Sequence, residues 1–339
     1  MEVIIIGGGL SGLVIANQLF KNDINPTIIE KEDKIGGLLK TTQFKNNNWE
    51  LGPHFFFLDP PNYDISEWLI RYTPLIELKH LYAGSIYQID PLRYTDWPLN
   101  KEKLKKQGFN IANNYYTKHT ENNSFKDYLR NLVGDNLYYT FFHYYTKHFW
   151  GMEPENMDSG WAPKKIRLTQ NKETFFKPEE RVFLPKNGYK HFVDQLSKNT
   201  TIIREKVKSI FSNKIITEQG NKYHADLFVN TISPDILTGL PKLKTRGLII
   251  IYIQLSNNIY LWNNNEGRIF YYFAKPNPFT RITNLSRIWG HINSNTPSNI
   301  FCLEWPIDPS SNFPSKKIQL KRTHEIIKFL NPYAKILDF

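Results

Sequence analysis

Near its N-terminus the chain carries the stretch Val3-Ile4-Ile5-Ile6-Gly7-Gly8-Gly9-Leu10-Ser11-Gly12-Leu13. A short run of β-branched residues that ends in glycines is typical of a buried parallel strand. An apolar face on residues 11–21 predicts a helix after the glycines, and the apolar run 27–29 predicts a second strand. A strand, a glycine turn, a helix and a strand within the first 30 residues form a βαβ unit, which predicts an α/β fold.

The glycines of this turn have the spacing G-x-G-x-x-G, with Gly7, Gly9 and Gly12 at the three fixed positions. The first glycine permits a tight turn, the second lets a pyrophosphate approach the backbone, and the third lets helix and strand pack closely. The free N–H groups at the start of the helix attract phosphates. Glu30 follows the second strand, where a carboxylate can bind a ribose and disfavours the 2′-phosphate of NADP. The sequence therefore predicts a dinucleotide site.

Composition excludes several classes of protein. The 339 residues include 43 Lys and Arg against 32 Asp and Glu, a net charge of +11, but the lysines are spread along the chain. Scattered charge of this kind is typical of a solvated surface, so we expect no nucleic-acid partner. With 40% hydrophobic and 15% aromatic residues the chain is rich enough to form a packed core.

The single cysteine, Cys302, excludes an internal disulfide and a cysteine-rich metal site, and the nine histidines form no recognisable ligand set. We therefore predict no metal. The longest apolar runs, 3–6 and 248–253, are far shorter than the roughly 20 residues of a membrane span. The N-terminus lacks the basic region of a signal peptide, so we expect a cytoplasmic protein without a transmembrane segment.

The remaining pattern predicts two interleaved regions. Helices are expected at 63–76, 124–145, 189–199 and 315–330, strands at 201–204, 214–218, 227–231, 248–255, 268–273 and 300–305, and an irregular segment at 158–178. We assign 1–75 plus 190–245 to a discontinuous Rossmann-like domain with a parallel sheet. A second, α+β region for substrate binding would comprise 76–189 plus 246–330, followed by a short tail, 331–339.

A second glycine pair identifies the group of proteins that this chain resembles. The run from Glu30 through Gly36-Gly37-Leu38 resembles the signature of flavoproteins in the amine-oxidase, protoporphyrinogen-oxidase and UDP-galactopyranose-mutase group. In that group the glycine pair lets the backbone pass close to FAD. The resemblance therefore implies that the Rossmann-like domain binds FAD.

Further motifs extend the resemblance over most of the chain. Those similar to the mutases are Gly52-Pro53-His54, Pro185 through Gly188-Tyr189, Thr280-Arg281-Ile282 and Glu304-Trp305-Pro306. The run from Tyr145-Thr146 through Trp150-Gly151 resembles one that the mutases and the oxidases share. Trp161-Ala162-Pro163 is closer to the oxidases, and Val207 begins a strand that places backbone against adenine in the group.

The resemblance implies a set of cofactor contacts. They are Gly7, Gly9, Leu10, Ser11, Gly12, Glu30, Lys31, Gly36, Gly37, Leu38, Gly52, Pro53, His54 and Val207. His54 is the candidate catalytic residue, because its equivalent lies beside the flavin ring. The alternative is a histidine that is hydrogen-bonded within its own loop.

Substrate contacts are expected from aromatic and basic residues. Arg281 could bind a diphosphate with two hydrogen bonds, with Tyr272 stacking nearby, or it could simply pair with a carboxylate. Lys186 and Asn187 occupy a turn where some mutases place an arginine. Tyr145 and Trp150 belong to the shared Tyr-Thr-x-x-x-Trp-Gly motif, whereas the aromatic run 137–145 as a whole is more typical of a core.

Three functions remain open. The first is an FAD-dependent oxidoreductase of the amine-oxidase or protoporphyrinogen-oxidase type, in which hydride passes from substrate to flavin N5. The second is an isomerase similar to UDP-galactopyranose mutase that uses reduced FAD on a nucleotide sugar. The sequence ends without the C-terminal Gly-Arg or Gly-Asp motif of the group. This departure keeps open a third function, a non-catalytic FAD-binding remnant, and a second chain that supplies the motif.

Overall fold

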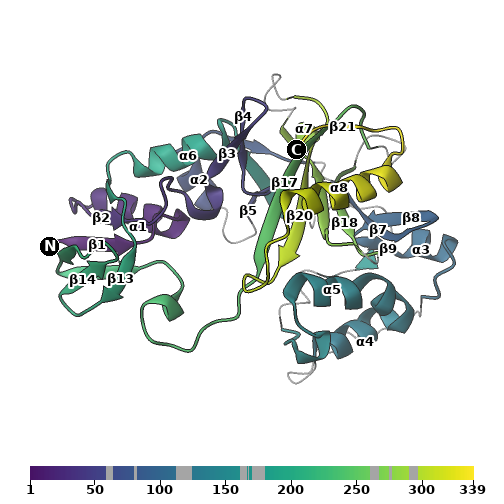
Figure 1. Ribbon diagram of the computed structural model, residues 1–339, viewed down its shortest axis with the longest axis horizontal. Helices are drawn as coiled ribbons and strands as arrows, with labels where there is room; N and C mark the ends of the chain where they lie inside the picture. The colour runs from purple at the N-terminus through teal and green to yellow at the C-terminus, as the bar shows by residue number, and fades with distance from the viewer. Residues whose placement is uncertain are drawn as a thin grey trace. The chain divides into compact units, whose positions relative to one another are not determined.

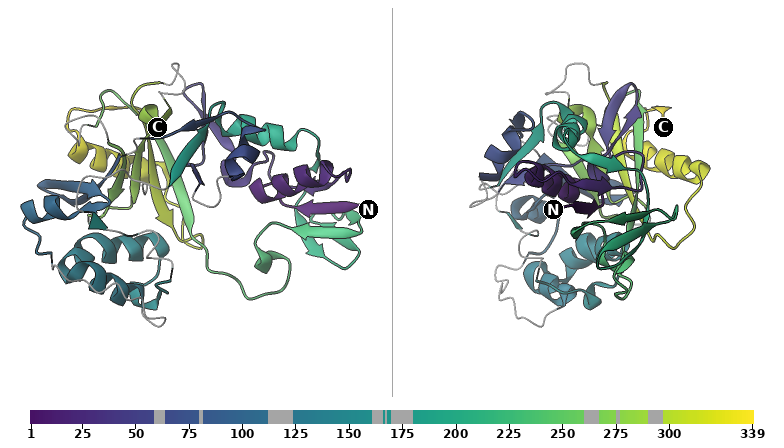
Figure 2. Two further views of the ribbon diagram at one scale, coloured as in Figure 1. Left: turned by 180° about the vertical axis from the view of Figure 1, so that it is seen from behind. Right: turned by 90° about the vertical axis from the view of Figure 1, so that its left-hand side faces the viewer.

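The computed structural model describes residues 1–58, 64–79, 82–111, 124–160, 166, 168–169, 180–259, 267–274, 277–289 and 297–339. The chain divides into two compact units (Figures 1 and 2). Unit 1 comprises Met1–Glu77 and Val182–Lys244, and unit 2 comprises Leu78–Arg181 and Thr245–Phe339.

The described part of unit 1 contains short strands and three helices. Its strands are β1 (Val3–Ile6), β2 (Thr27–Ile29), β3 (Thr41–Phe44), β4 (Asn47–Glu50), β5 (Phe56–Leu58), β6 (Leu75–Glu77), β11 (Arg181–Pro185), β12 (Thr201–Ile203), β13 (Val207–Ile210), β14 (Lys214–Thr217), β15 (Lys222–His224) and β16 (Leu227–Asn230). Its helices are α1 (Leu10–Phe20), α2 (Asp64–Ile70) and α6 (Gly188–Ser197), with 3₁₀ turns η1 (Gly37–Leu39) and η5 (Pro234–Ile236).

The predicted βαβ unit lies at the centre of a four-stranded parallel sheet. Its strand order is β12-β2-β1-β16, and β1 pairs in parallel with both β2 and β16. All four residues of β1 are buried, as expected for a strand covered on both faces. The α/β class and the Rossmann-like start predicted from the sequence are confirmed.

A close approach between strand and helix explains the first and third glycines of the turn. A Cβ on Gly12 would lie 2.0 Å from the carbonyl oxygen of Gly7, so α1 could not pack here with any larger residue. Gly7 itself has φ +106°, a conformation that residues with a side chain rarely adopt. The turn therefore needs glycine at both positions for the fold alone.

Helix α6 packs its apolar face against other parts of unit 1. Phe192 and Val193 are buried; the ring of Phe192 lies 5.4 Å from that of Phe56, and Val193 Cγ2 would be 3.2 Å from a Cβ on Gly36. The Asn17 side chain of α1 donates to the carbonyl of Leu196 near the other end of α6. One helix thus touches three separate segments of the predicted Rossmann-like domain.

Unit 2 is built on a larger sheet. Its strands are β7 (Tyr82–Ile89), β8 (Leu92–Trp97), β9 (Leu99–Asn100), β10 (Leu168–Thr169), β17 (Gly247–Leu255), β18 (Gly267–Tyr272), β19 (Arg281–Asn284), β20 (Ile300–Ile307) and β21 (Ile336–Asp338). Its helices are α3 (Lys101–Lys106), α4 (Phe125–Leu137), the π-helix η2 (Tyr138–Phe142), α5 (His143–Trp150), α7 (Leu285–Trp289) and α8 (Lys316–Leu330), with a 3₁₀ turn η3 (Pro154–Asn156).

The seven-stranded sheet of unit 2 has the order β21-β17-β20-β19-β18-β7-β8 and is mixed, because only β18 and β7 pair in parallel. Helix α8 lies along this sheet (Figure 1) and contributes Ile326, Ile327 and Leu330 to its core. A second core forms around α4, η2 and α5, where Tyr138, Phe141 and Phe142 are buried. This confirms the prediction that the aromatic run mainly builds a core.

Several predicted boundaries change in the structure. The helix expected at 63–76 is shorter: α2 ends at Ile70 and strand β6 begins at Leu75, because Pro74 disfavours helical backbone at Thr73. Residues 331–339, expected as a tail, include β21, which pairs with β17. Residues 182–189, assigned above to the substrate region, lie in unit 1, where β11 pairs with β6. Much of the irregular segment 158–178 lies outside the described residues.

We predict that Gly12→Ala lowers the free energy of unfolding by about 2 kcal/mol or more, since overpacking against a backbone atom must separate α1 from β1. Urea unfolding would measure the change. Gly9→Ala is the matched control: its Cβ would meet the Cα of Gly37 at 3.9 Å, an ordinary contact, and its φ is −75°. A Gly12→Ala protein as stable as the control would contradict the close approach.

Candidate functional site

The glycine turn of unit 1 leaves backbone accessible where a pyrophosphate would bind. Gly9 precedes α1 as its N-cap, and no side chain caps the helix there. Leu10 is 38% exposed although it is apolar, and Ser11 beside it is also exposed. Free N–H groups at a helix N-terminus, with glycine in front of them, form an anion site.

Glu30 lies beside this turn. One oxygen of its carboxylate accepts a hydrogen bond from the N–H of Gly8 at 2.6 Å, and the other accepts from the N–H of Glu32 at 2.9 Å. Glu30 therefore orders the turn itself, a role that the sequence did not reveal. Lys31, next to it, is exposed and pairs with Glu32 at 3.6 Å.

The second glycine pair packs directly on the first turn. The N–H of Gly36 donates to the carbonyl of Gly8 at 2.8 Å, and a Cβ on Gly37 would lie 3.0 Å from the Cα of Gly9. Both Gly36 and Gly37 have positive φ, at +109° and +57°. Leu38 follows, and 74% of its surface is exposed, which is a large exposed fraction for an apolar side chain.

The Gly52-Pro53-His54 segment follows β4 and is held by local contacts. Gly52 has φ +88°, and its carbonyl lies 2.9 Å from His54 Nδ1. The His54 ring meets Tyr189 edge-on at 6.3 Å. The loop hydrogen bond expected in the alternative interpretation is thus present, and a role of His54 toward a flavin stays a prediction.

Val207 begins β13 and is 7% exposed within a small core that also contains Ile4, Ile6 and Ile29 of the parallel sheet. Its side chain therefore supports the sheet, and the expected contact of its backbone with adenine stays a prediction. The glycine turn, the exposed side chains of Leu10 and Leu38, and the Glu30 carboxylate, which could bind a ribose, together fit a bound dinucleotide.

In unit 2 Arg281 and Glu304 form a close ion pair on neighbouring strands β19 and β20. Arg281 Nε and Nη2 lie 2.7 and 2.6 Å from Glu304 Oε1, and Glu304 is 3% exposed whereas Arg281 keeps 25% of its side-chain surface. Burial would lower the pKa of Arg281, but the Glu304 carboxylate raises it above its usual range. Arg281 is therefore a fixed cation with an accessible edge.

Tyrosines surround this cation. Arg281 donates a hydrogen bond to the Tyr271 hydroxyl oxygen, and the Tyr271 ring lies 6.3 Å from that of Tyr145. Burial raises the pKa of both phenols, so both remain protonated near neutral pH. Tyr272 is 2% exposed within the core of the sheet, because adjacent residues of a strand face opposite sides. Tyr271, and not Tyr272, therefore lies beside Arg281, an arrangement that alternation along β18 could have indicated.

Trp150 ends helix α5 and is 46% exposed. The end of the helix is held by Arg246, which donates to the carbonyl of Phe149 at 3.1 Å and to that of His148 at 3.0 Å. Gly151 follows with φ +65°, and a Cβ there would lie 2.8 Å from Arg246 Nη1. Arg246 thus caps the carbonyls that the helix leaves unpaired next to Trp150.

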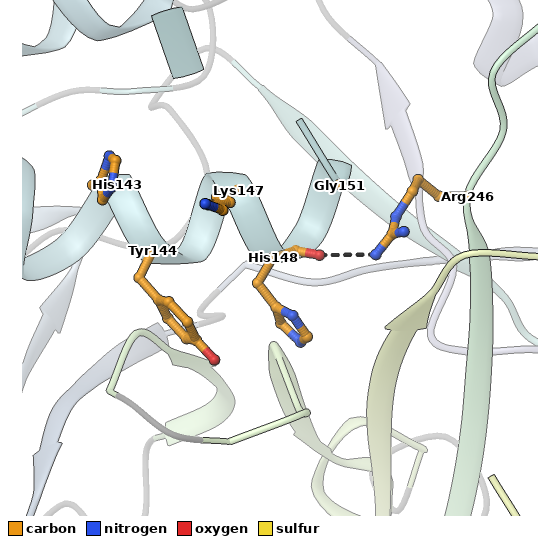
Figure 3. A pocket seen from close by; sticks show the side chains of 6 residues that line it. All are labelled: His143, Tyr144, Lys147, His148, Gly151 and Arg246. Atoms are coloured by element: carbon orange, nitrogen blue, oxygen red, sulfur yellow. Dashed lines mark hydrogen bonds between the residues drawn. The ribbon is translucent and has the colours of Figure 1, made fainter. Parts of the chain in front are cut away.

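A cavity of about 450 Å³ lies on this face of α5 (Figure 3). Its lining residues are His143, Tyr144, Lys147, His148, Gly151 and Arg246. The rings of Tyr144 and His148 stack at 5.8 Å, and His148 Nε2 lies 2.7 Å from the carbonyl of Pro278. Burial lowers the pKa of His148. None of these lining residues was among the predicted site residues, although Lys147, His148 and Gly151 lie within the Tyr145–Gly151 motif.

Lys186 and Asn187 lie in unit 1, in the turn between β11 and α6. Both are exposed, and the N–H of Lys186 donates to the carbonyl of Pro74 at 2.7 Å. Their predicted phosphate contact stays a prediction.

Over the described part of the chain, no group of three His, Cys, Asp or Glu side chains could hold a metal ion. Among the same residues, no helix is both long and apolar enough to cross a membrane.

Two models of known families match the chain. A model of the family "UDP-galactopyranose mutase" matches residues 140–334, and a model of the "NAD(P)-binding Rossmann-like domain" matches residues 5–71. The first match covers more than half of the chain and includes Tyr145, Arg281 and Glu304. The chain belongs to the UDP-galactopyranose mutase family, which is a family of flavoproteins.

Individual relatives agree. The chain is 27% identical over 235 residues to the dTDP-fucopyranose mutase of Escherichia coli, in an alignment that covers 64% of this chain and 60% of the relative. It is 24% identical over 213 residues to the "probable UDP-galactopyranose mutase" of Klebsiella pneumoniae, with coverage of 59% and 54%. Each alignment thus spans less than two thirds of the relative's length.

Solved structures show the same fold. A crystal structure of reduced UDP-galactopyranose mutase matches with a TM-score of 0.79 and 16% identity, over 99% of this chain and 81% of that one. An oxidoreductase from Methanosarcina mazei matches with a TM-score of 0.66 and 12% identity, over 100% and 87%. The family match favours the mutase, which the sequence analysis placed second, over the oxidoreductase that it placed first.

We predict that Arg246→Met lowers the free energy of unfolding by about 2–3 kcal/mol, because two hydrogen bonds from a charged group to the end of α5 are lost. Urea unfolding followed by tryptophan fluorescence would measure this. Arg246→Lys keeps the charge but lacks the planar guanidinium that reaches both carbonyls, so it should recover only part of the loss. Full stability in Arg246→Met would show that the cap contributes little.

Proposed function

We propose that this protein is an FAD-dependent mutase that interconverts the pyranose and furanose forms of a sugar attached to a pyrimidine nucleoside diphosphate. The proposal rests on one observation above all: the region that matches the mutase family contains the Tyr145, Tyr271 and Arg281 cluster. Its support in unit 1 is the glycine turn with Glu30. The relatives' names cover both UDP-galactopyranose and dTDP-fucopyranose mutases, so the proposal extends to either nucleotide.

The residues of unit 2 have chemistry suited to a sugar nucleotide. A guanidinium with an accessible edge binds a diphosphate strongly, and Glu304 holds Arg281 in one orientation for that contact. The neutral phenols of Tyr145 and Tyr271 can stack on a base or donate to phosphate oxygens. Trp150, at the capped end of α5, offers an apolar wall for a sugar.

In unit 1 the glycine turn and the N-terminus of α1 would hold the pyrophosphate of FAD, and Glu30 its ribose. When bound and reduced, the flavin supplies a nucleophile for the anomeric carbon, so the reaction has no net change in redox state. His54 would orient the ring from the Gly52–His54 segment. The protein itself binds and orients the cofactor and the sugar nucleotide.

An oxidoreductase is the second candidate, because the fold is shared with the Methanosarcina mazei oxidoreductase. Such an enzyme would pass hydride from its substrate to oxidised flavin, and a substrate alone would bleach the flavin. A mutase would need an external reductant and would leave the flavin reduced. This difference separates the two functions in one spectrophotometric experiment.

We predict that Glu30→Ala raises the dissociation constant for FAD by about tenfold to a hundredfold, because it removes charged hydrogen bonds to the ribose and to the glycine turn. Glu30→Gln keeps the shape and should show a smaller rise. A fluorescence titration of the apoprotein would measure both. Wild-type affinity in Glu30→Ala would mean that the ribose is held elsewhere.

We predict that the reduced, FAD-loaded protein converts UDP-galactopyranose or dTDP-fucopyranose to its furanose form, detected by chromatography. Arg281→Ala should raise the dissociation constant for UDP or dTDP about thirtyfold or more, since a partly buried charge contact to phosphate is lost. The double variant Arg281→Met/Glu304→Gln removes both charges and controls for the unpaired Glu304 carboxylate. Unchanged nucleotide affinity in both variants would exclude Arg281 from the site.

A further inference from the structure

A buried carboxyl group stands immediately before the segment that carries His54. Glu50 is the last residue of β4 and is 5% exposed. Its carbonyl accepts a hydrogen bond from the N–H of Gly52 at 2.8 Å, which tightens the turn into Gly52-Pro53-His54. The functions proposed above give this carboxyl no role.

The Glu50 carboxylate accepts hydrogen bonds from its own N–H and from the N–H of Tyr189, in the first turn of α6. Asn187, at the N-cap of that helix, makes no capping hydrogen bond with its side chain. A helix N-terminus leaves its first N–H groups unpaired and attracts negative charge, so a carboxylate from a distant strand can take the place of the cap. Glu50 lies 139 positions before Tyr189 in the chain.

Helix α6 connects this contact to the cofactor segments of unit 1. Tyr189 meets His54 at 6.3 Å and Phe56 at 5.3 Å between ring centroids. Val193, one turn later, faces Gly36 of the second glycine pair. A displacement of the N-terminus of α6 would therefore move the neighbours of both His54 and Gly36.

We propose that Glu50 is a positioning residue: its carboxylate fastens the Gly52–His54 segment to the first turn of α6 and so holds His54 in place for the flavin. The part that concerns the flavin rests on the proposed function. The fastening itself is a property of the chain and can be measured without any cofactor.

The electrostatic surroundings fit this assignment. Burial raises the pKa of Glu50 to about 7, while the two backbone N–H groups act in the opposite direction. Burial and the nearby Glu50 charge raise the pKa of Tyr189 well above 10, so its phenol stays neutral. The carboxylate is thus kept at a cost in solvation, which backbone hydrogen bonds offset only in part. A buried charge of this kind adds little to the stability of the fold, so we attribute its presence to the contact that it makes.

The test compares Glu50→Met with Glu50→Gln in the whole chain. Methionine fills a similar volume and removes a buried charge, so the thermal midpoint should stay equal or rise. Methionine cannot accept a hydrogen bond from the Tyr189 N–H. We therefore expect hydrogen exchange at the Tyr189 amide to be at least tenfold faster in the Glu50→Met apoprotein than in the wild-type apoprotein. We also expect at least tenfold weaker FAD binding and a shifted flavin absorption band. Glutamine keeps an acceptor oxygen and should restore all three to within about threefold of wild type.

Asn48→Met provides a matched control, because Asn48 lies two positions earlier on the same face of β4 and is exposed. It should change none of the three measurements. A stable Glu50→Met protein with wild-type exchange at Tyr189 would overturn the fastening. Fast exchange with unchanged FAD affinity and spectrum would overturn the role toward the flavin. If the wild-type chain binds no FAD, the proposed function fails, while the exchange measurement still decides whether Glu50 holds α6.

Discussion

The approach of α1 to β1 at Gly7 and Gly12 is the constraint on which the rest of unit 1 depends. Because a Cβ on Gly12 would lie only 2.0 Å from the Gly7 carbonyl oxygen, the helix can pack only on a glycine turn. That contact directs the N-terminus of α1 toward the place where phosphates would bind. The second glycine pair then packs on the same turn through the Gly36 N–H and the Gly8 carbonyl. Each later part of the dinucleotide site is built on this first contact.

Helices α5 and α6 share a second feature. Each is held at one end by an ionisable side chain from a distant part of the chain: α5 by Arg246 at its C-terminus, and α6 by Glu50 at its N-terminus. The signs agree with the helix dipole, since a cation meets carbonyls and the ionised form of Glu50 is an anion that meets N–H groups. In both helices the held end carries a residue of the proposed site or touches one, Trp150 in α5 and Tyr189 beside His54 in α6.

The division of chemistry between the units bears on the choice between mutase and oxidoreductase. Unit 1 contains the glycine turn and Glu30, which suit a dinucleotide cofactor. Unit 2 contains a fixed cation, Arg281, with phenols around it, which suits an anionic substrate. A diphosphate group meets that requirement directly. The family match over residues 140–334 includes this cation and its phenols together with part of unit 1.

Local sequence determined much of this molecule. The β-branched run 3–6, the glycine spacing and the amphipathic stretches at 189–199 and 315–330 each specify their element through near neighbours, and the structure has these elements. The aromatic run 137–145 was correctly expected to be core, and the glycine pair at 36–37 correctly indicated a flavoprotein. Pro74 could also have indicated that α2 ends before it, although 63–76 was predicted as one helix.

Only the tertiary structure decided which distant residues meet. Nothing local pairs Arg281 with Glu304, Arg246 with the end of α5, or Glu50 with Tyr189, because each contact depends on strand register or helix placement set by the whole unit. The same holds for Tyr271 and Tyr272, which face opposite sides of β18: Tyr272 lies within the core of the sheet, and Tyr271 packs against the core around α4, η2 and α5. Sequence by itself determined the elements and the cofactor motif, since these depend on near neighbours. The site depends on long-range packing, and so only the folded chain could assemble it.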